Sequence, residues 1–379
     1  MHVSELIWST TDSWKGDQRG NKSANLVLYF GARRALADKA RFEELHKMFP
    51  KAHVLGCSTG GQIHNGDVVD DKITALAIEF HKTRLKMVCE PIAGTDASYN
   101  CGVTIGRALK TDDLAGIFLL SDGLRINGSK LVSGITSIVG RKIPLTGGLA
   151  GDGAEFNETL IGADDAPSPY RVAAIGFYGS DIRIGHGSAG GWDVFGPRRR
   201  ITKSTGNLLL ELDNEPALDL YERYLGEEDA KELPGTALLF PLQVSNPDLP
   251  HSDIMRTVLA VNREKRTMTF AGDMPEGWVA QLMRGNFERL SAGAADAARQ
   301  AQSGIGKCES VAILVSCIGR RLLMGQRTSD EIEAAGAILG EKTHRLGFYS
   351  YGEISPHAAS GICELHNQTM TITTFHEAA

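Results

Sequence analysis

Four stretches of this sequence place glycines or polar side chains directly after apolar runs, where a strand end would present them to a ligand. These positions are Cys57, Ser58, Thr59, Gly60 and Gly61, then Gly147, Gly148 and Asp152, then Cys317 and Arg320, and finally Glu353. Consecutive backbone N–H groups with hydroxyls beside them can hold a carboxylate or a phosphate. Because open α/β sheets bind ligands beyond the carboxyl ends of their strands, we predict ligand contacts at these turns. Glycines that only turn the chain sharply are the alternative.

Charged side chains in these stretches can recognise the two ends of a small metabolite. The planar guanidinium of Arg320 can grip a carboxylate through two hydrogen bonds, or it can form an internal salt bridge, for example to Glu353. Glu353 can instead receive an amine of the ligand. Asp152 can likewise anchor an amine or cap its own turn. The sequence alone leaves both alternatives open for each residue.

His366 and Asn367 precede the last apolar run of the chain. One neutral imidazole can ligate haem iron, and no CxxCH motif for covalent haem attachment is present. Hydrogen bonding within the fold is the other role for His366, and it is the one we favour. The histidines show no HExxH motif and no paired Cys and His spacing, so no metal site is predicted.

A cysteine nucleophile paired with a histidine is the catalytic alternative. Cys57 or Cys317 with His366 would form such a pair. The ordinary state of a free cysteine, however, is that of a small buried side chain. The sequence also lacks a GxxxxGK[ST] loop for nucleotide phosphates. We therefore predict no catalytic residues and a binding protein rather than an enzyme.

Composition and charge narrow the class of protein. The chain has 379 residues, of which 42% are hydrophobic and 23% charged, as in ordinary globular proteins. Its net charge of -6 argues against nucleic-acid binding, which requires a positive surface. No apolar run reaches the ~18 residues of a membrane-spanning helix, and the first residues do not resemble a signal peptide. We therefore predict a cytoplasmic protein without membrane insertion.

One pattern of elements recurs three times and must position these residues. Each copy reads as strand, helix, strand, glycine-rich turn and strand, in residues 26–80, 116–178 and 311–375. Strands interleaved with helices indicate an α/β fold. The repeated strand-helix-strand-strand units indicate mixed sheets rather than one parallel sheet.

Other segments complete the expected chain. We predict helices over 32–48 and 286–303 and a hairpin formed by 255–262 and 267–272. Residues 1–24 are loosely patterned, and no element is assigned to them. The charged segment 226–234, broken by Pro-Gly, is the predicted boundary between two lobes, residues 24–226 and 235–377.

The motifs GCSTGGQI, SCIGRR, GFYSYGEISP and LHNQTMTIT resemble those of the FIST family, in the family's order and over nearly the whole chain. The resemblance implies a sensory module with amino-terminal and carboxy-terminal FIST domains that binds a small, amino-acid-like ligand. Some similar standalone proteins bind haem, sense nitric oxide and act on histidine kinases. Gln62 departs from the Glu expected in a GGEI-like version of the first motif, which removes any role for a carboxylate there.

The resulting hypothesis is a cytoplasmic sensor in signal transduction that binds a small metabolite, amino-acid-like or a carboxylate, in a cleft between its two domains. No kinase, cyclase or chemoreceptor segment is attached. The protein would therefore signal in trans, to a histidine kinase or a cyclic-nucleotide signalling protein. A haem-binding nitric-oxide sensor, with His366 as the haem ligand, is the first alternative, and a Cys/His-dependent enzyme is the second. The hypothesis requires the turns at Thr59, Asp152 and Glu353 to meet at one hollow.

Overall fold

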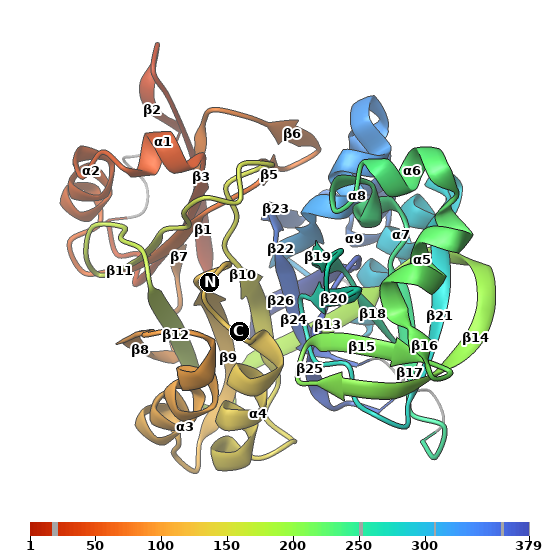
Figure 1. Cartoon of the computed structure of the whole chain (residues 1–379). Helices are drawn as coiled ribbons and strands as arrows, with labels where there is room; N and C mark the ends of the chain where they lie inside the picture. Colours follow the sequence, from red (N-terminus) through yellow and green to blue (C-terminus); the bar gives the residue numbers. More distant parts are fainter. Residues whose placement is uncertain (17–21, 250–252, 307, 358–359, 379) are drawn as a thin grey trace.

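Figure 1 shows the computed structural model, which describes residues 1–16, 22–249, 253–306, 308–357 and 360–378. The chain forms mixed sheets with helices packed on them and divides into two lobes, so the predicted α/β class is confirmed. Within the described residues, no helix is both long and apolar enough to cross a membrane.

The three predicted repeats are present. The first begins with two strands more than the sequence pattern indicated, and the second and third each begin with one more. The first contains β1 (His2–Ser9), β2 (Ser13–Gly16), β3 (Leu26–Gly31), α1 (Arg33–Leu36), α2 (Ala40–Met48), β4 (His53–Ser58), β5 (Gln62–His64), β6 (Asp67–Val69) and β7 (Ile73–Glu79). The second contains β8 (Arg84–Pro91), η1 (Thr95–Ala97), α3 (Ser98–Leu109), β9 (Leu114–Ser121), α4 (Gly128–Val139), β10 (Leu145–Leu149), β11 (Ile161–Ala163) and β12 (Arg171–Tyr178).

The third repeat is interrupted after its first strand by an insert, residues 192–285. It contains β13 (Ile182–Ala189), α7 (Phe287–Ser303), β22 (Ser310–Cys317), α8 (Ile318–Met324), η3 (Gly325–Arg327), α9 (Thr328–Leu339), β23 (Thr343–Ser350), β24 (Gly352–Pro356), β25 (Cys363–His366) and β26 (Met370–Glu377). The insert contains β14 (Trp192–Thr205), β15 (Leu208–Leu212), β16 (Glu215–Pro216), α5 (Ala217–Leu225), α6 (Glu227–Lys231), η2 (Gly235–Leu239), β17 (Leu242–Ser245), β18 (Ile254–Arg256), β19 (Val258–Asn262), β20 (Thr267–Phe270) and β21 (Val279–Gly285).

The three repeats exchange strands and thereby close into a ring. Their sheets share one internal order: β4-β3-β7-β1, β10-β9-β12-β8 and β23-β22-β26-β13. In each, the first two strands are parallel and the third is antiparallel. The free side of each sheet pairs with a short strand from another repeat: β11 with β4, β24 with β10, and β5 with β23. Every repeat therefore depends on another to complete its sheet.

Apolar side chains of all three sheets meet in a shared core, as expected for strands with near-continuous apolar runs. The ring centroids of Phe30 and Phe348 lie 4.4 Å apart and join the first and third repeats. Those of Phe177 and Phe375 lie 4.7 Å apart and join the second and third. Each of these sheets has a second face, which points away from the shared core. Helix pairs α3–α4 and α7–α9 cover this face of the second and third sheets.

The insert has its own sheet and its own apolar core. Figure 1 shows its strands in green to cyan at the right of the view. Trp192 on β14 lies opposite Gly285 on β21, so the insert leaves and rejoins the ring at adjacent points. The predicted boundary 226–234 lies inside this insert, and the predicted hairpin is present as β19 and β20.

Two local predictions differ from the structure. Residues 1–16 contain β1 and β2, where no element was assigned. The predicted helix 32–48 is divided into α1 and α2, because Asp38 accepts a hydrogen bond from the N–H of Ala40 and starts a new helix there.

Candidate functional site

The turns after β4, β10 and β23 meet one another through backbone hydrogen bonds. The pattern is cyclic, because each repeat donates to another from an equivalent position. The N–H groups of Gly60, Gly151 and Tyr351 donate to the carbonyl oxygens of Tyr349, Ser58 and Leu149, at 2.8, 2.9 and 3.2 Å. Turns that are far apart in sequence therefore form one structural unit.

Gln62 and Glu353 occupy equivalent positions just beyond these turns, opposite Phe348 and Gly148 respectively. The Gln62 amide lies 2.8 Å from the Thr59 hydroxyl, and the Ser350 hydroxyl donates to Glu353 at 2.6 Å. The first repeat thus has an amide where the third has a carboxyl group. Glu353 is fully buried, and burial raises its pKa to about 8.

A polar hollow of about 260 Å³, here called the turn pocket, opens beside the first two turns. Its cationic side chains are Arg33, Arg34 and Arg321, and its acidic side chains include Asp70, Asp71 and Glu155. Thr59, Gly60 and Gly61 line it from the first repeat, Asp152 from the second and Arg321 from the third. The turn pocket is therefore lined almost wholly by the first two repeats, with Arg321 as the contribution of the third, and Glu353 lies outside its lining.

Asp152 is held by its own loop. Its side chain is buried and accepts hydrogen bonds from the N–H groups of Asn157 and Glu158, both at 2.9 Å, and from the Tyr351 hydroxyl. The capping role is thus the one observed. Arg33 Nε lies 3.8 Å from this carboxylate and has no hydrogen-bond partner among the described residues.

Arg320 is held inside the protein. Its Nε and Nη2 donate to Glu331 Oε2 at 2.9 and 2.7 Å, and its Nη1 donates to the Gly190 carbonyl at 2.6 Å. The internal partner is therefore Glu331 rather than Glu353. The next residue, Arg321, faces the turn pocket, where it donates to the Gly60 carbonyl and, at 2.6 Å, to Asp70. No signal in the sequence separates these two adjacent arginines.

The remaining predicted residues near the turns are packed into the core. Cys57 and Cys317 are buried, and burial raises the pKa of both thiols. Gly147 has a φ of +133°, and a Cβ there would lie 1.9 Å from the Leu119 carbonyl oxygen. At Gly148 a Cβ would lie 2.7 Å from Val315. These two glycines allow close packing.

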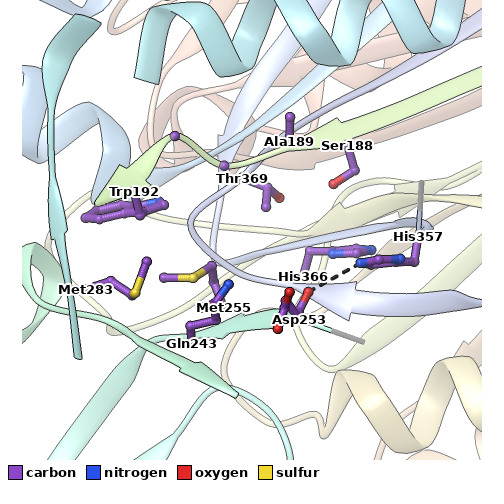
Figure 2. A pocket seen from close by; sticks show the side chains of 12 residues that line it. Ser188, Ala189, Trp192, Gln243, Asp253, Met255, Met283, His357, His366 and Thr369 are labelled. Atoms are coloured by element: carbon purple, nitrogen blue, oxygen red, sulfur yellow. Dashed lines mark hydrogen bonds between the residues drawn. The ribbon is translucent and has the colours of Figure 1, made fainter. Parts of the chain in front are cut away.

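His366 lines a different hollow, of about 210 Å³, between the ring and the insert. Figure 2 shows its ring beside that of His357, with Trp192 and Met283 at the other end. His366 Nε2 lies 3.0 Å from the Ser355 carbonyl oxygen, so Nε2 carries the proton because a carbonyl only accepts. Burial lowers the pKa of His366 to about 4, which keeps the ring neutral.

Asn367 is fully buried, and neither its amide nitrogen nor its amide oxygen has a partner within the described part of the chain. It follows His366 in sequence but does not line the turn pocket. The structure thus divides the predicted residues between the turn pocket, the core and the hollow at His366.

One motif was overlooked in the sequence. Residues 56–60, GCSTG, match the GxSxG pattern of a nucleophilic serine. In that motif a helix follows the strand, whereas here β4 is followed by β5. Ser58 is also fully buried, and its hydroxyl accepts a hydrogen bond from the Leu160 N–H at 2.9 Å. This serine therefore has the surroundings of a structural residue.

Comparison with known families agrees with this architecture. The FIST N domain matches residues 25–215, and the FIST C domain matches residues 217–356. The chain therefore belongs to the FIST family, whose domains are associated with sensing in signal transduction.

Individual similar proteins add little about function. Uncharacterized protein MJ1623 of Methanocaldococcus jannaschii is 25% identical over 371 residues, covering 87% of this chain and 69% of that protein. A crystal structure of cyanuric acid hydrolase from A. caulinodans is 11% identical and covers 78% of this chain and 100% of its own, with a TM-score of 0.19. A TM-score this low carries no functional argument.

Proposed function

We propose that this FIST protein is a cytoplasmic sensor that binds a small zwitterionic metabolite, such as an amino acid, in the turn pocket. One observation carries the proposal: all three repeats contribute to one hollow that contains both guanidinium and carboxylate groups. Thr59, Asp152 and Arg321 come from different repeats and line it together. A ligand with one positive and one negative end matches this mixture of charges.

The ion pairs around the pocket suit such a ligand. Arg33 pairs with Glu155 at 2.6 Å, and Arg321 pairs with Asp70 at 2.6 Å. Exposed pairs of this kind contribute only about 0–1 kcal/mol, so opening them costs little. The ligand carboxylate would bind the guanidinium groups, and its ammonium group would bind the carboxylates.

Signalling requires that the ligand prefer one arrangement of the protein, since otherwise no equilibrium shifts. Arg321 lies on α8, and α8 contacts η2 of the insert. A ligand that holds Arg321 would thus favour one position of α8 relative to the insert. The output would act in trans, on a histidine kinase or a cyclic-nucleotide signalling protein.

A thermal-shift screen of amino acids and small carboxylates tests the proposal. A ligand at 100 times its Kd adds ~2.7 kcal/mol of stability, which such a screen detects. Arg321→Gln should remove most of the shift. Arg327→Gln is the matched control, because Arg327 forms exposed ion pairs with Glu288 and Asp330 away from the pocket. An unchanged shift in Arg321→Gln would refute the site.

The haem alternative finds less support. The hollow beside His366 measures about 210 Å³, whereas pockets for drug-sized ligands measure about 300–1,000 Å³. The hollow beside His366 is therefore smaller than the pockets that hold ligands of drug size. Purified protein supplied with haem should show no Soret band, and a band abolished by His366→Ala would reinstate this alternative.

The enzyme alternative also finds less support. A catalytic cysteine acts as its thiolate, whereas burial raises the pKa of the Cys57 and Cys317 thiols. Both side chains are at most 2% exposed. The proposal of a binding protein therefore stands ahead of a Cys/His-dependent enzyme.

A further inference from the structure

A separate hollow of about 200 Å³, here called the insert pocket, lies where the second and third repeats meet the insert. Leu149, Cys317 and Tyr351 line it from the repeats, and Leu238, Thr257 and Leu259 line it from the insert. All of its lining residues are uncharged. A charged ligand would lose its hydration there without gaining a partner, so the insert pocket selects neutral molecules.

Two apolar side chains at this pocket remain exposed, one from the second repeat and one from the insert. Phe156 is 41% exposed and Leu259 is 46% exposed. The Phe156 ring stacks on Tyr351 with centroids 4.6 Å apart. The backbone of Phe156 has a φ of +48°, which is unfavourable for a residue other than glycine. The loop therefore holds an aromatic ring at the pocket in a conformation that a free chain would avoid.

Thr257 supplies an unpaired polar group. It is 4% exposed, and its hydroxyl has no hydrogen-bond partner among the residues that the structure describes. Buried hydroxyls without partners are rare in native proteins, because burial removes water without replacing its hydrogen bonds. Rotation of the Thr257 side chain about χ1 would turn this hydroxyl toward the insert pocket, where a ligand with one polar group could supply the missing bond.

We propose that the insert pocket is a second binding site, for a small uncharged molecule with an aromatic or branched apolar body and one hydroxyl or carbonyl group. Its apolar body packs between Leu149, Leu238 and the Phe156–Tyr351 pair, and its polar group bonds to Thr257. Its volume equals several times the ~30 Å³ share of one water molecule, enough for a single six-membered ring.

Such a ligand would also contact both the repeats and the insert, so its binding favours one arrangement of the two. The Tyr351 hydroxyl bonds to Asp152, which lines the turn pocket. The two pockets thus share one hydrogen-bonded pair, although their ligands differ in charge.

Fluorine NMR titration with 4-fluorophenol and fluorobenzene tests the proposal, because the two probes differ in one hydroxyl. The wild-type protein should bind both saturably and prefer 4-fluorophenol. Thr257→Val should lower the affinity for 4-fluorophenol by roughly 2- to 10-fold, the effect of one hydrogen bond, and should leave fluorobenzene binding unchanged. Equal binding of the two probes by the wild type, or a preference that survives in Thr257→Val, would overturn the assigned role of Thr257.

Variants that fill or alter the pocket test its position. Ala271 lines the pocket, so Ala271→Leu should abolish binding of both probes. Ala260→Leu, at an exposed position of β19 outside the pocket lining, should not. If Ala271→Leu does not fold, Leu259→Lys at a half-exposed side chain serves the same purpose. Arg327→Gln, which alters a side chain outside the lining of both pockets, should leave both affinities unchanged. Absence of binding to the wild type, or wild-type affinities in the pocket variants, would overturn the proposal.

Discussion

Glu353 links a single side chain to the pH dependence of stability. Burial raises its folded pKa to about 8 from an ordinary value of 4.5. Between these values the folded protein holds a proton that the unfolded chain has lost, so the free energy of unfolding falls as pH rises through this window. Glu353→Gln should remove that fall and gain stability relative to wild type between about pH 5 and about pH 8. Urea unfolding at both pH values measures the difference.

The first repeat already shows that an amide can occupy the position of Glu353. Gln62 already places an amide at the equivalent position of the first repeat, so the amide introduced by Glu353→Gln should be accommodated. A variant with the same pH dependence as wild type would show that the Glu353 carboxyl does not titrate in this window.

Glu377 gives the opposite pH dependence of stability. Its burial disfavours the charged form, but N–H groups of His81, Lys82 and Thr83 donate to it and together hold its pKa at about 2. The stability it contributes is therefore present above about 4.5 and is lost as pH falls towards 2. Glu377→Gln should destabilise the protein by about 1–3 kcal/mol near neutral pH, because the amide nitrogen faces donors.

This destabilisation should shrink on acidification, since below about 4.5 the unfolded chain takes up a proton that the folded Glu377 does not, and this offsets the stability that the ionised carboxylate contributes. Chemical unfolding of both proteins at about pH 7 and about pH 3 checks this. A difference that stays constant between the two conditions would contradict the assignment of the ionised carboxylate as the interacting form.

At the scale of elements, a buried ion pair ties α8 to α9 and β23. Glu331 accepts from Arg320, and also from the hydroxyls of Ser316 at 2.9 Å and Tyr349 at 3.0 Å. Arg320→Met would leave the Glu331 charge buried and uncompensated, at a cost of about 3–5 kcal/mol. Adding Glu331→Gln should recover part of this loss. Urea unfolding of the two single variants and the double variant measures the coupling, and strictly additive effects would contradict it.

The sequence predicted elements well where their hydrophobic pattern is local. The near-continuous apolar runs at β3, β9 and β22 were identified because these strands are buried on both faces. β1 was missed because buried and half-buried residues mix along it. The exchanged strands β5 and β11 contain only 3 residues each, and their partners lie in other repeats, so no local pattern specifies the pairing.

In the candidate site, too, features set by the local sequence were predicted, and features set by residues far away in the sequence were not. The turns were predicted from apolar runs that end in glycine. The directions in which their individual side chains point were not predicted. Arg321 rather than Arg320 faces the turn pocket, since consecutive helical residues point about 100° apart. Asp152 could be read as a ligand contact or a cap, and only its partners in the loop decide between these roles.

At the scale of the whole molecule, the ring should fold without the insert. Trp192 and Gly285 are paired across β14 and β21, so a short Gly-Ser link can replace residues 193–284. The ring retains its shared core and all three exchanged strands. We expect this shortened protein to unfold in one cooperative transition. Matching circular dichroism and fluorescence transitions would support this expectation, and an unfolded chain would show that the insert holds the ring together.

The central claim is that one ligand contacts all three repeats in the turn pocket. Hydrogen exchange, measured with and without an amino acid identified in the thermal-shift screen, tests it most directly. The account predicts slower exchange at 58–62, 152–158 and α8 together, because these segments line the pocket or hold its lining. Protection confined to the segments around His366, with none at the three turn segments, would contradict it.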